Sequence, residues 1–261
     1  MGKIIVAVNQ KGGVGKTTTA INLAASLAKR GKKVLLVDID PQGNATSGLG
    51  VAKEDVENSI YELLLGEASI EDCIVKDVYP KLSLIPSVLD LAAAELELAD
   101  IDRKEYLLKN NLDKVVDQYD YVLIDCPPAL NILTINSMCA ADSALVPIQC
   151  EYYALEGLTQ LLKTIELVTE RMNANLKVEG ILFTMYDART NLSQEVVQNV
   201  KNNLNLPIYN TIIPRNVRLA EAPSYGQPII EYDPKSTGAL CYMRLAKEVI
   251  KANRKKLWKR D

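Results

Sequence analysis

The sequence predicts an α/β fold: a mostly parallel, twisted sheet with helices on both faces. Short, continuously apolar runs alternate with segments whose apolar residues recur at helical spacing, as in parallel sheets that are covered on both sides. The chain has 261 residues, 48% of them hydrophobic, which suits one domain spanning residues 1–261. In such sheets ligands bind at the carboxyl ends of the strands, so we expect the functional residues directly after them.

Five apolar runs are predicted to be strands, and three segments between or after them are predicted to be helices. The strands are expected at residues 4–8, 34–37, 121–124, 144–146 and 178–183. One helix follows the first strand, with Ile21, Ala24, Ala25 and Ala28 on one face; another carries the stripe Leu155, Leu158, Leu162 and Ile165; the last covers residues 237–256.

The composition excludes several classes of site. The chain has no histidine, so any acid–base chemistry falls to Asp, Glu, Lys or water. Its five cysteines form no Cys-x-x-Cys pair, which argues against a zinc site or a disulfide framework and fits a reducing cytosol. The chain starts without a signal-peptide pattern, and no apolar run is long enough for a transmembrane helix.

The charge is unevenly distributed along the chain. The net charge is −3, but residues 189–261 carry 13 Lys or Arg against 6 Asp or Glu, whereas residues 1–188 carry 17 against 27. A local basic face matters more for nucleic-acid binding than the net charge. The last third is therefore the part of the chain to search for a DNA-binding surface.

A glycine-rich segment at residues 9–18 lies between the first predicted strand and the first helix. Its glycines let successive backbone N–H groups point at phosphate oxygens, and the helix N-terminus adds partial positive charge. Lys16 would neutralise the β- and γ-phosphates, and the Thr17 hydroxyl would bind Mg²⁺. The candidate ATP-binding residues here are Lys11, Gly12, Gly13, Val14, Gly15, Lys16, Thr17 and Thr18.

The loop departs from the standard phosphate-binding pattern in that Gln10 stands where a glycine is required, and Lys11 is an additional lysine. This variant resembles the deviant Walker A motif of the ParA/MinD branch of P-loop ATPases. The resemblance implies that Lys11 reaches across a dimer interface to the ATP of the partner subunit. Lys11 and Lys16 are then both candidate catalytic residues.

Acidic residues end two further predicted strands. Asp38 and Asp40 follow residues 34–37, and Asp40 begins a Pro- and Gly-containing loop. In the family this loop is switch I, and the residue matching Asp40 orients the attacking water. Asp38 is a candidate either for the Mg²⁺ site or for holding the loop. Asp125 follows residues 121–124 in a Walker B pattern and would bind Mg²⁺ through a water molecule.

The resemblance extends over nearly the whole chain. Residues 149–157, 187–191 and 213–218 also look like chromosomal ParA proteins of the Soj type. It implies a Mg-ATP-dependent homodimer in the cytoplasm, on the nucleoid, that binds double-stranded DNA without sequence preference and hydrolyses ATP slowly until a ParB-type partner stimulates it. A replication initiator is a further partner known in the family. The helix-turn-helix domain that precedes the loop in other members is not expected, since the loop starts at residue 11.

The resemblance also gives candidates outside the phosphate loop. Pro214 and Asn216 are the candidates for contacting the adenine. Arg189 and Arg218 match residues implicated in DNA binding across the family, and Arg215 is an additional candidate. Arginine suits this role because its planar guanidinium group can donate two hydrogen bonds to a phosphate.

Three other functions remain open on the same loop. A MinD-like division-site ATPase would cycle on the membrane through a C-terminal amphipathic helix, but here Leu257 and Trp258 are the only bulky apolar residues of the basic tail. A relative of the nitrogenase iron protein would need cysteine ligands for a bridging cluster, and Cys126 is not placed to match them. A small-molecule ligase or kinase would need a further substrate pocket.

Overall fold

The computed structural model describes residues 2–151 and 154–257. Tyr152 and Tyr153, which lie in one of the segments that resemble ParA, fall outside the described residues, as do Trp258 and the side chain of Leu257. Within the described ranges, no helix is both long and apolar enough to cross a membrane.

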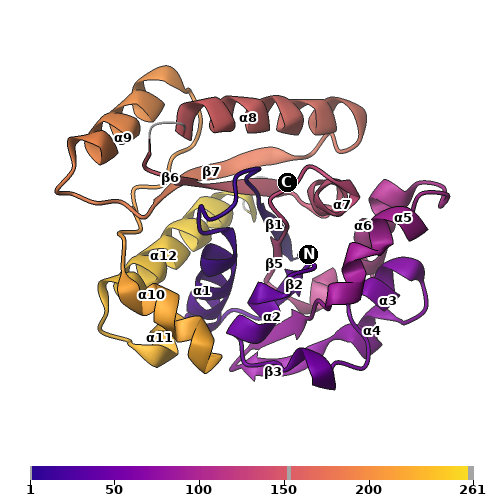
Figure 1. Cartoon of the computed structure of the whole chain (residues 1–261). Helices are drawn as coiled ribbons and strands as arrows, with labels where there is room; N and C mark the ends of the chain where they lie inside the picture. Colours follow the sequence, from indigo (N-terminus) through magenta and orange to yellow (C-terminus); the bar gives the residue numbers. More distant parts are fainter. Residues whose placement is uncertain (1, 152–153, 258–261) are drawn as a thin grey trace.

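Seven strands in the described residues form one sheet, in the order β3-β4-β2-β5-β1-β6-β7 (Figure 1). All neighbours are parallel except β3, which runs antiparallel to β4 at one edge. The strands are β1 (Lys3–Ala7), β2 (Val34–Asp38), β3 (Val75–Tyr79), β4 (Leu82–Ile85), β5 (Tyr121–Asp125), β6 (Ser143–Gln149) and β7 (Lys177–Thr184). The five predicted strands are confirmed, and β3 and β4 are additional to the prediction.

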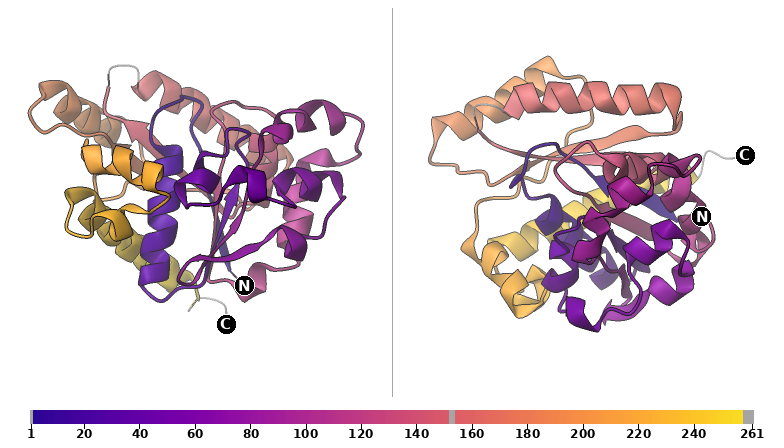
Figure 2. Two further views of the ribbon diagram at one scale, coloured as in Figure 1. Left: turned by 60° about the horizontal axis from the view of Figure 1, so that its bottom comes forward. Right: turned by 45° about the vertical axis from the view of Figure 1, so that its right-hand side comes forward.

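Helices cover both faces of the sheet, as predicted (Figures 1 and 2). The longer ones are α1 (Lys16–Lys29), α7 (Ile132–Ala140), α8 (Ala154–Arg171), α9 (Asn191–Asn203) and α12 (Thr237–Leu257). The shorter α-helices are α2 (Asn44–Gly48), α3 (Ile60–Leu65), α4 (Ile70–Cys73), α5 (Ala94–Glu97), α6 (Leu107–Leu112), α10 (Val217–Glu221) and α11 (Ile229–Tyr232). Single 3-10 turns are η1 (Lys53–Asp55), η2 (Leu89–Ala92), η3 (Lys104–Tyr106), η4 (Val116–Gln118) and η5 (Ala222–Tyr225).

The alternation of side chains along β1 shows why its sequence is continuously apolar. Ile4 and Val6 pack into a core with α3, α7, α8 and α9, whereas Ile5 and Ala7 pack into a second core with α1 and α12. Successive strand residues point to opposite faces, so a strand covered on both sides has no polar face. The three predicted helices are confirmed as α1, α8 and α12.

The strand order brings the carboxyl ends of β2, β5 and β1 side by side. Asp125 at the end of β5 is in register with Asp38 of β2 on one side and with Ala7 of β1 on the other. The glycine-rich loop leaves β1 at this edge and leads into α1 at Lys16. The topology therefore gathers the predicted phosphate and acidic residues at one place.

Candidate nucleotide site

The glycine-rich loop has the backbone conformation that its glycines allow. Gly13 and Gly15 have φ angles of 74° and 88°, in the left-handed region that other residues rarely adopt, and Gly15 directly precedes α1. A Cβ atom at Gly12 would meet nothing within 4 Å, so this part of the loop faces open space. The loop can thus present its N–H groups outward to a ligand.

Two hydrogen bonds tie the loop to the neighbouring strands, and a third lies within the loop. The Asn9 amide donates to the backbone oxygen of Pro147 at 2.7 Å, and its oxygen accepts from the Lys11 N–H at 3.0 Å. The Thr184 hydroxyl, at the end of β7, donates to the backbone oxygen of Val14 at 2.8 Å. The loop is therefore held in shape by β6 and β7 without any ligand.

The two lysines of the loop have different surroundings. Lys16 is buried, with 6% of its surface exposed, and its ammonium group donates to the backbone oxygen of Lys11 at 3.2 Å. The side chain of Lys11 is 47% exposed, and its ammonium group forms an ion pair with Glu151 of the same chain. The Lys16 side chain thus lies inside the loop, whereas the Lys11 side chain lies on the outer side of the loop.

Asp125 is a fully buried carboxylate, and neither of its oxygens has a hydrogen-bond partner. Burial and the neighbouring Asp38 raise its pKa well above the ordinary value, while the Thr17 hydroxyl and the Lys16 ammonium are near enough to oppose this rise. Unpaired buried carboxylates are unfavourable, and such a group signals a missing positive partner. An Mg²⁺ ion beside Thr17 fits this arrangement.

No group of three or more His, Cys, Asp or Glu in the described part of the chain is arranged to hold a metal ion by itself. Mg²⁺ typically keeps several waters and uses one or two protein groups together with phosphate oxygens. The residues here therefore fit a magnesium ion that arrives with a nucleotide, and they do not form an all-protein metal cage.

Asp38 is also fully buried, but both of its carboxylate oxygens accept hydrogen bonds. One accepts from the Thr46 N–H and hydroxyl, both at 2.8 Å, and the other accepts from the Asp40 N–H at 3.3 Å. Burial raises the pKa of Asp38 to about 6, with the Thr46 hydrogen bonds opposing the shift. Of its two candidate roles, these contacts favour holding the switch loop.

Asp40 begins a tight turn and is 8% exposed. One oxygen of its carboxylate accepts from the Gln42 N–H at 2.9 Å, and its backbone oxygen accepts from the Gly43 N–H at 2.8 Å and from the Ser87 hydroxyl at 2.7 Å. Asp40 is also close enough to Asp125 for its charge to contribute to the raised pKa of Asp125. The turn leaves the second carboxylate oxygen of Asp40 without a hydrogen bond from within the loop.

Cys126, next to Asp125, is buried and donates its S–H to the backbone oxygen of Ala7 at 3.2 Å. Burial and the adjacent Asp125 raise the pKa of its thiol to about 12. A thiol that stays protonated and buried is a packing residue and not a nucleophile.

Both adenine candidates follow a short bridge to the end of β7. Pro214 pairs with Tyr186, two residues beyond the Thr184 that holds the phosphate loop. The Asn216 side-chain oxygen accepts from the Arg218 N–H at 2.8 Å and so caps α10. Pro214 thus lies beside the chain that leaves β7, and the Asn216 oxygen is used by the helix cap.

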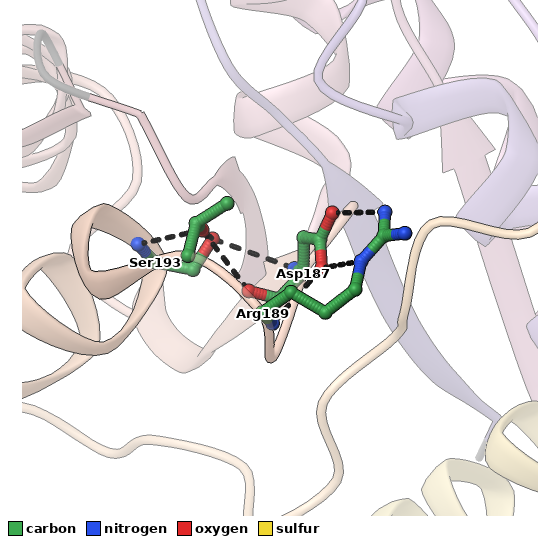
Figure 3. A network of polar contacts seen from close by, with 4 residues as sticks. Asp187, Arg189 and Ser193 are labelled. Atoms are coloured by element: carbon green, nitrogen blue, oxygen red, sulfur yellow. Dashed lines mark hydrogen bonds and ion pairs between the residues drawn. The ribbon is translucent and has the colours of Figure 1, made fainter.

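The three candidate DNA-binding arginines lie on the loops and helix near this segment, and all three are exposed. The Arg189 guanidinium group forms a bidentate ion pair with the Asp187 carboxylate, with hydrogen bonds of 2.9 and 2.7 Å. Figure 3 shows this pair next to Ser193, near the start of α9. Arg189, together with Arg215, lowers the pKa of Asp187. Arg189 is thus the arginine that pairs with this carboxylate, and the charge of Arg215 has a smaller effect on it.

Arg218 is also paired with carboxylates. It contacts Glu221 at 2.8 Å and Asp233 at 3.7 Å, and the Tyr232 hydroxyl donates to the same Glu221 oxygen at 3.1 Å. Exposed ion pairs of this kind contribute little to stability and exchange partners readily. The arginine surface is therefore partly neutralised in the isolated chain.

Sequence reasoning missed Glu151, Thr46 and Ser87 as parts of the site. Ser87 stands two residues after β4, in the position at which functional residues follow the other strands. The apolar run of β4 is too short to predict a strand, so the sequence gives no strand end there that would point to Ser87.

The chain is similar to known partition proteins and to a solved nucleotide-bound structure. A family model described as "AAA domain" matches residues 2–178. The sporulation initiation inhibitor protein Soj of Bacillus subtilis is 57% identical, over 95% of this chain and 98% of that protein. The chromosome partitioning protein ParA of Myxococcus xanthus is 51% identical, over 96% of this chain and 89% of that protein. The crystal structure titled cobyrinic acid a,c-diamide synthase from Mycobacterium smegmatis, with bound ADP and magnesium, has a TM-score of 0.86 at 37% identity and covers 98% of this chain and 97% of that one.

Proposed function

The chain belongs to the ParA/Soj family of chromosome-partitioning ATPases within the MinD/ParA superfamily, and we propose that it is a Mg-ATP-dependent DNA-partitioning ATPase. In this proposal ATP joins two subunits into a sandwich dimer, the dimer binds double-stranded DNA without sequence preference, and hydrolysis releases it. A ParB-type partner stimulates the hydrolysis, so that cycles of binding and release move a chromosome or plasmid. The observation that carries the proposal is the deviant loop, in which Lys16 is buried and Lys11 faces outward.

Each group around the loop has a defined part in this reaction. Lys16 and the N–H groups of residues 12–18 hold the β- and γ-phosphates, and Thr17 and Asp125 hold Mg²⁺, Asp125 through a water molecule. When bound, Mg²⁺ neutralises charge that develops on the phosphate oxygens. Asp40 orients the attacking water through its free carboxylate oxygen.

The position of Lys11 supports dimerisation. In the isolated chain its ammonium group is paired with Glu151 at the edge of an open face, and no side chain covers Gly12. A second loop could approach this face closely, so that Lys11 exchanges Glu151 for the phosphates of the partner subunit. Hydrolysis in the absence of a partner should be slow, because the chain has no histidine base and the described residues offer no arginine beside the loop.

The arginine surface supports DNA binding by phosphate contact. Arg189, Arg215 and Arg218 come from two neighbouring segments, and a dimer would present them twice on one rigid body. Such contacts carry no sequence information, which fits binding along the nucleoid.

The name of the solved synthase raises a small-molecule reaction as a second function. Its sequence identity to this chain, 37%, is well below the 57% and 51% of the two partition proteins, and the phosphate site alone accounts for the bound ADP and magnesium of that structure. The MinD-like alternative predicts binding to membranes instead of DNA, and a vesicle sedimentation assay separates the two.

The proposed function is tested by measuring ATP hydrolysis with Mg-ATP alone, with plasmid DNA, and with DNA plus a purified ParB-type protein. We expect a slow basal rate that rises when both are present, and no activity for Lys16→Ala. A rate that DNA and the ParB-type protein leave unchanged, together with no ATP-dependent DNA binding, would refute a partitioning role.

A further inference from the structure

We propose that Ser87 is a positioning residue for ATP hydrolysis, whose hydroxyl group holds the backbone of Asp40 in place. The inference rests on the proposed function, in which Asp40 orients the attacking water. It adds to that function a residue that follows β4, a strand whose end carries none of the phosphate-loop, switch or Walker B residues.

The Ser87 side chain is fully buried just beyond the carboxyl end of β4. Its hydroxyl donates to the backbone oxygen of Asp40 at 2.7 Å. Its own N–H donates to the Thr46 hydroxyl oxygen at 2.9 Å. Ser87 is thus fixed at its backbone and directs its one side-chain donor at the switch loop.

The contact belongs to a chain of buried hydrogen bonds that crosses three elements. The Thr46 hydroxyl, on α2, accepts from Ser87 and donates to the Asp38 carboxylate at the end of β2. Asp38 in turn accepts from the N–H of Asp40. The peptide groups on both sides of Asp40 are therefore held, the N–H by Asp38 and the carbonyl by Ser87.

The turn that carries Asp40 needs this external support. Residues 40–43 form an Asp-Pro-Gln-Gly turn, closed by the Gly43 N–H on the Asp40 backbone oxygen at 2.8 Å. That bond fixes the shape of the turn but not its position relative to the sheet. A Cβ atom at Gly43 would lie 2.8 Å from the backbone oxygen of Ser87, so the turn also packs tightly against this residue.

The geometry assigns positioning to Ser87 and leaves the chemistry to Asp40. The hydroxyl of Ser87 donates to a backbone oxygen and makes no hydrogen bond to the Asp40 carboxylate. Catalytic groups that orient a nucleophile lose much of their effect when they are displaced by a fraction of an ångström. Removal of the Ser87 hydroxyl should therefore slow hydrolysis while nucleotide binding is kept.

The test compares Ser87→Ala with Ser26→Ala in the full-length protein. Ser26 is the matched control, since it is also fully buried but its hydroxyl has no hydrogen-bond partner and it lies on α1 away from the turn. We expect kcat of Ser87→Ala to fall about tenfold, as expected for one lost hydrogen bond, with KM for ATP nearly unchanged. Ser26→Ala should keep the wild-type kcat and KM.

A second variant tests the hydrogen bond itself and guards against instability of the alanine variant. Ser87→Cys keeps nearly the same volume with a weaker donor, so its kcat should lie between those of wild type and Ser87→Ala. Wild-type kcat in both Ser87 variants would overturn the proposal, as would a rise in KM that accounts for the whole loss. Absence of hydrolysis in the wild type would instead refute the proposed function, so the two failures are distinguishable.

Discussion

Exchange of Arg218 for glutamine should weaken DNA binding and also reduce its dependence on salt. A dimer would offer six arginines to DNA, two copies each of Arg189, Arg215 and Arg218. Each phosphate contact contributes about 0.9 to the slope of log K against log salt, so six contacts predict a slope of about −5.4 and a loss of about 1,800-fold between 50 and 200 mM salt. Arg218→Gln leaves four contacts, a slope of about −3.6 and a loss of about 150-fold over the same range.

The ion pair between Arg218 and Glu221 also predicts a variant that binds DNA more tightly, which the same experiment can measure. Glu221 holds Arg218 at 2.8 Å in the isolated chain, so DNA has to compete with this carboxylate. Glu221→Gln keeps an oxygen for the Tyr232 hydroxyl and removes the negative charge. We expect this variant to bind DNA several-fold more tightly than the wild type.

The assay is fluorescence anisotropy with a labelled duplex in Mg-ATP, at four or five salt concentrations. Arg171→Gln is the control of equal charge change, because Arg171 ends α8 on the opposite face of the sheet from Arg218. Arg218→Gln with the same affinity and slope as Arg171→Gln would refute the assignment. Binding that persists at low salt in a variant carrying both Arg189→Glu and Arg218→Glu would place the DNA surface elsewhere.

Four further predictions concern the nucleotide site. Lys16→Ala should lose Mg-ATP binding in calorimetry, since the other lysine of the loop, Lys11, is assigned to the phosphates of the partner subunit. Lys11→Ala and Gly12→Val should bind ATP but remain monomers in light scattering; the open space around Gly12 means that its variant should still fold. Asp40→Ala should bind ATP, stop hydrolysing and accumulate as a dimer, and a wild-type rate of phosphate release would contradict its role. Asp125→Asn should raise the stability of the nucleotide-free protein by about 1–3 kcal/mol in denaturant unfolding, because it removes an unpaired buried carboxylate, and should lose the additional stabilisation by Mg-ATP.

The sequence predicted the central strands of the fold because these are buried on both faces. The same reasoning could not find β3, where the side chains of Lys76 and Asp77 are exposed at the sheet edge, or β4, which has four residues. All of the helices that the structure describes between residues 44 and 118 have six residues or fewer, too few for helical periodicity to show. Their positions depend on tertiary packing, which no local pattern records.

The residues of the candidate site also divide into those that sequence motifs predict and those that only the fold brings together. Lys16, Thr17 and Asp125 were predicted because they stand at fixed distances from glycines or from a strand end. The contact of Ser87 with Asp40 spans 47 residues, and it exists only because the ends of β2 and β4 are neighbours. The pairing of Arg218 with Asp233 likewise depends on the packing of α10 against α11. Sequence motifs therefore predict the residues proposed to contact the ligand. The residues that hold those side chains in place can be identified only from the folded structure.

The polar groups around the site fall into two classes that match the steps of the proposed cycle. Asp38 and the backbone of the turn at Asp40 are held by buried hydrogen bonds within the chain, so the geometry proposed for hydrolysis would be largely set before ATP binds. Asp125 has no hydrogen-bond partner, whereas the exposed side chains of Lys11 and Arg218 are paired with the partly buried carboxylates of Glu151 and Glu221. The incomplete groups are the ones assigned to Mg²⁺, to the second subunit and to DNA. Passing from free monomer to DNA-bound dimer would then require a partner for the buried Asp125 and exchange of the carboxylates paired with Lys11 and Arg218, while the buried network that positions Asp40 stays intact through the cycle.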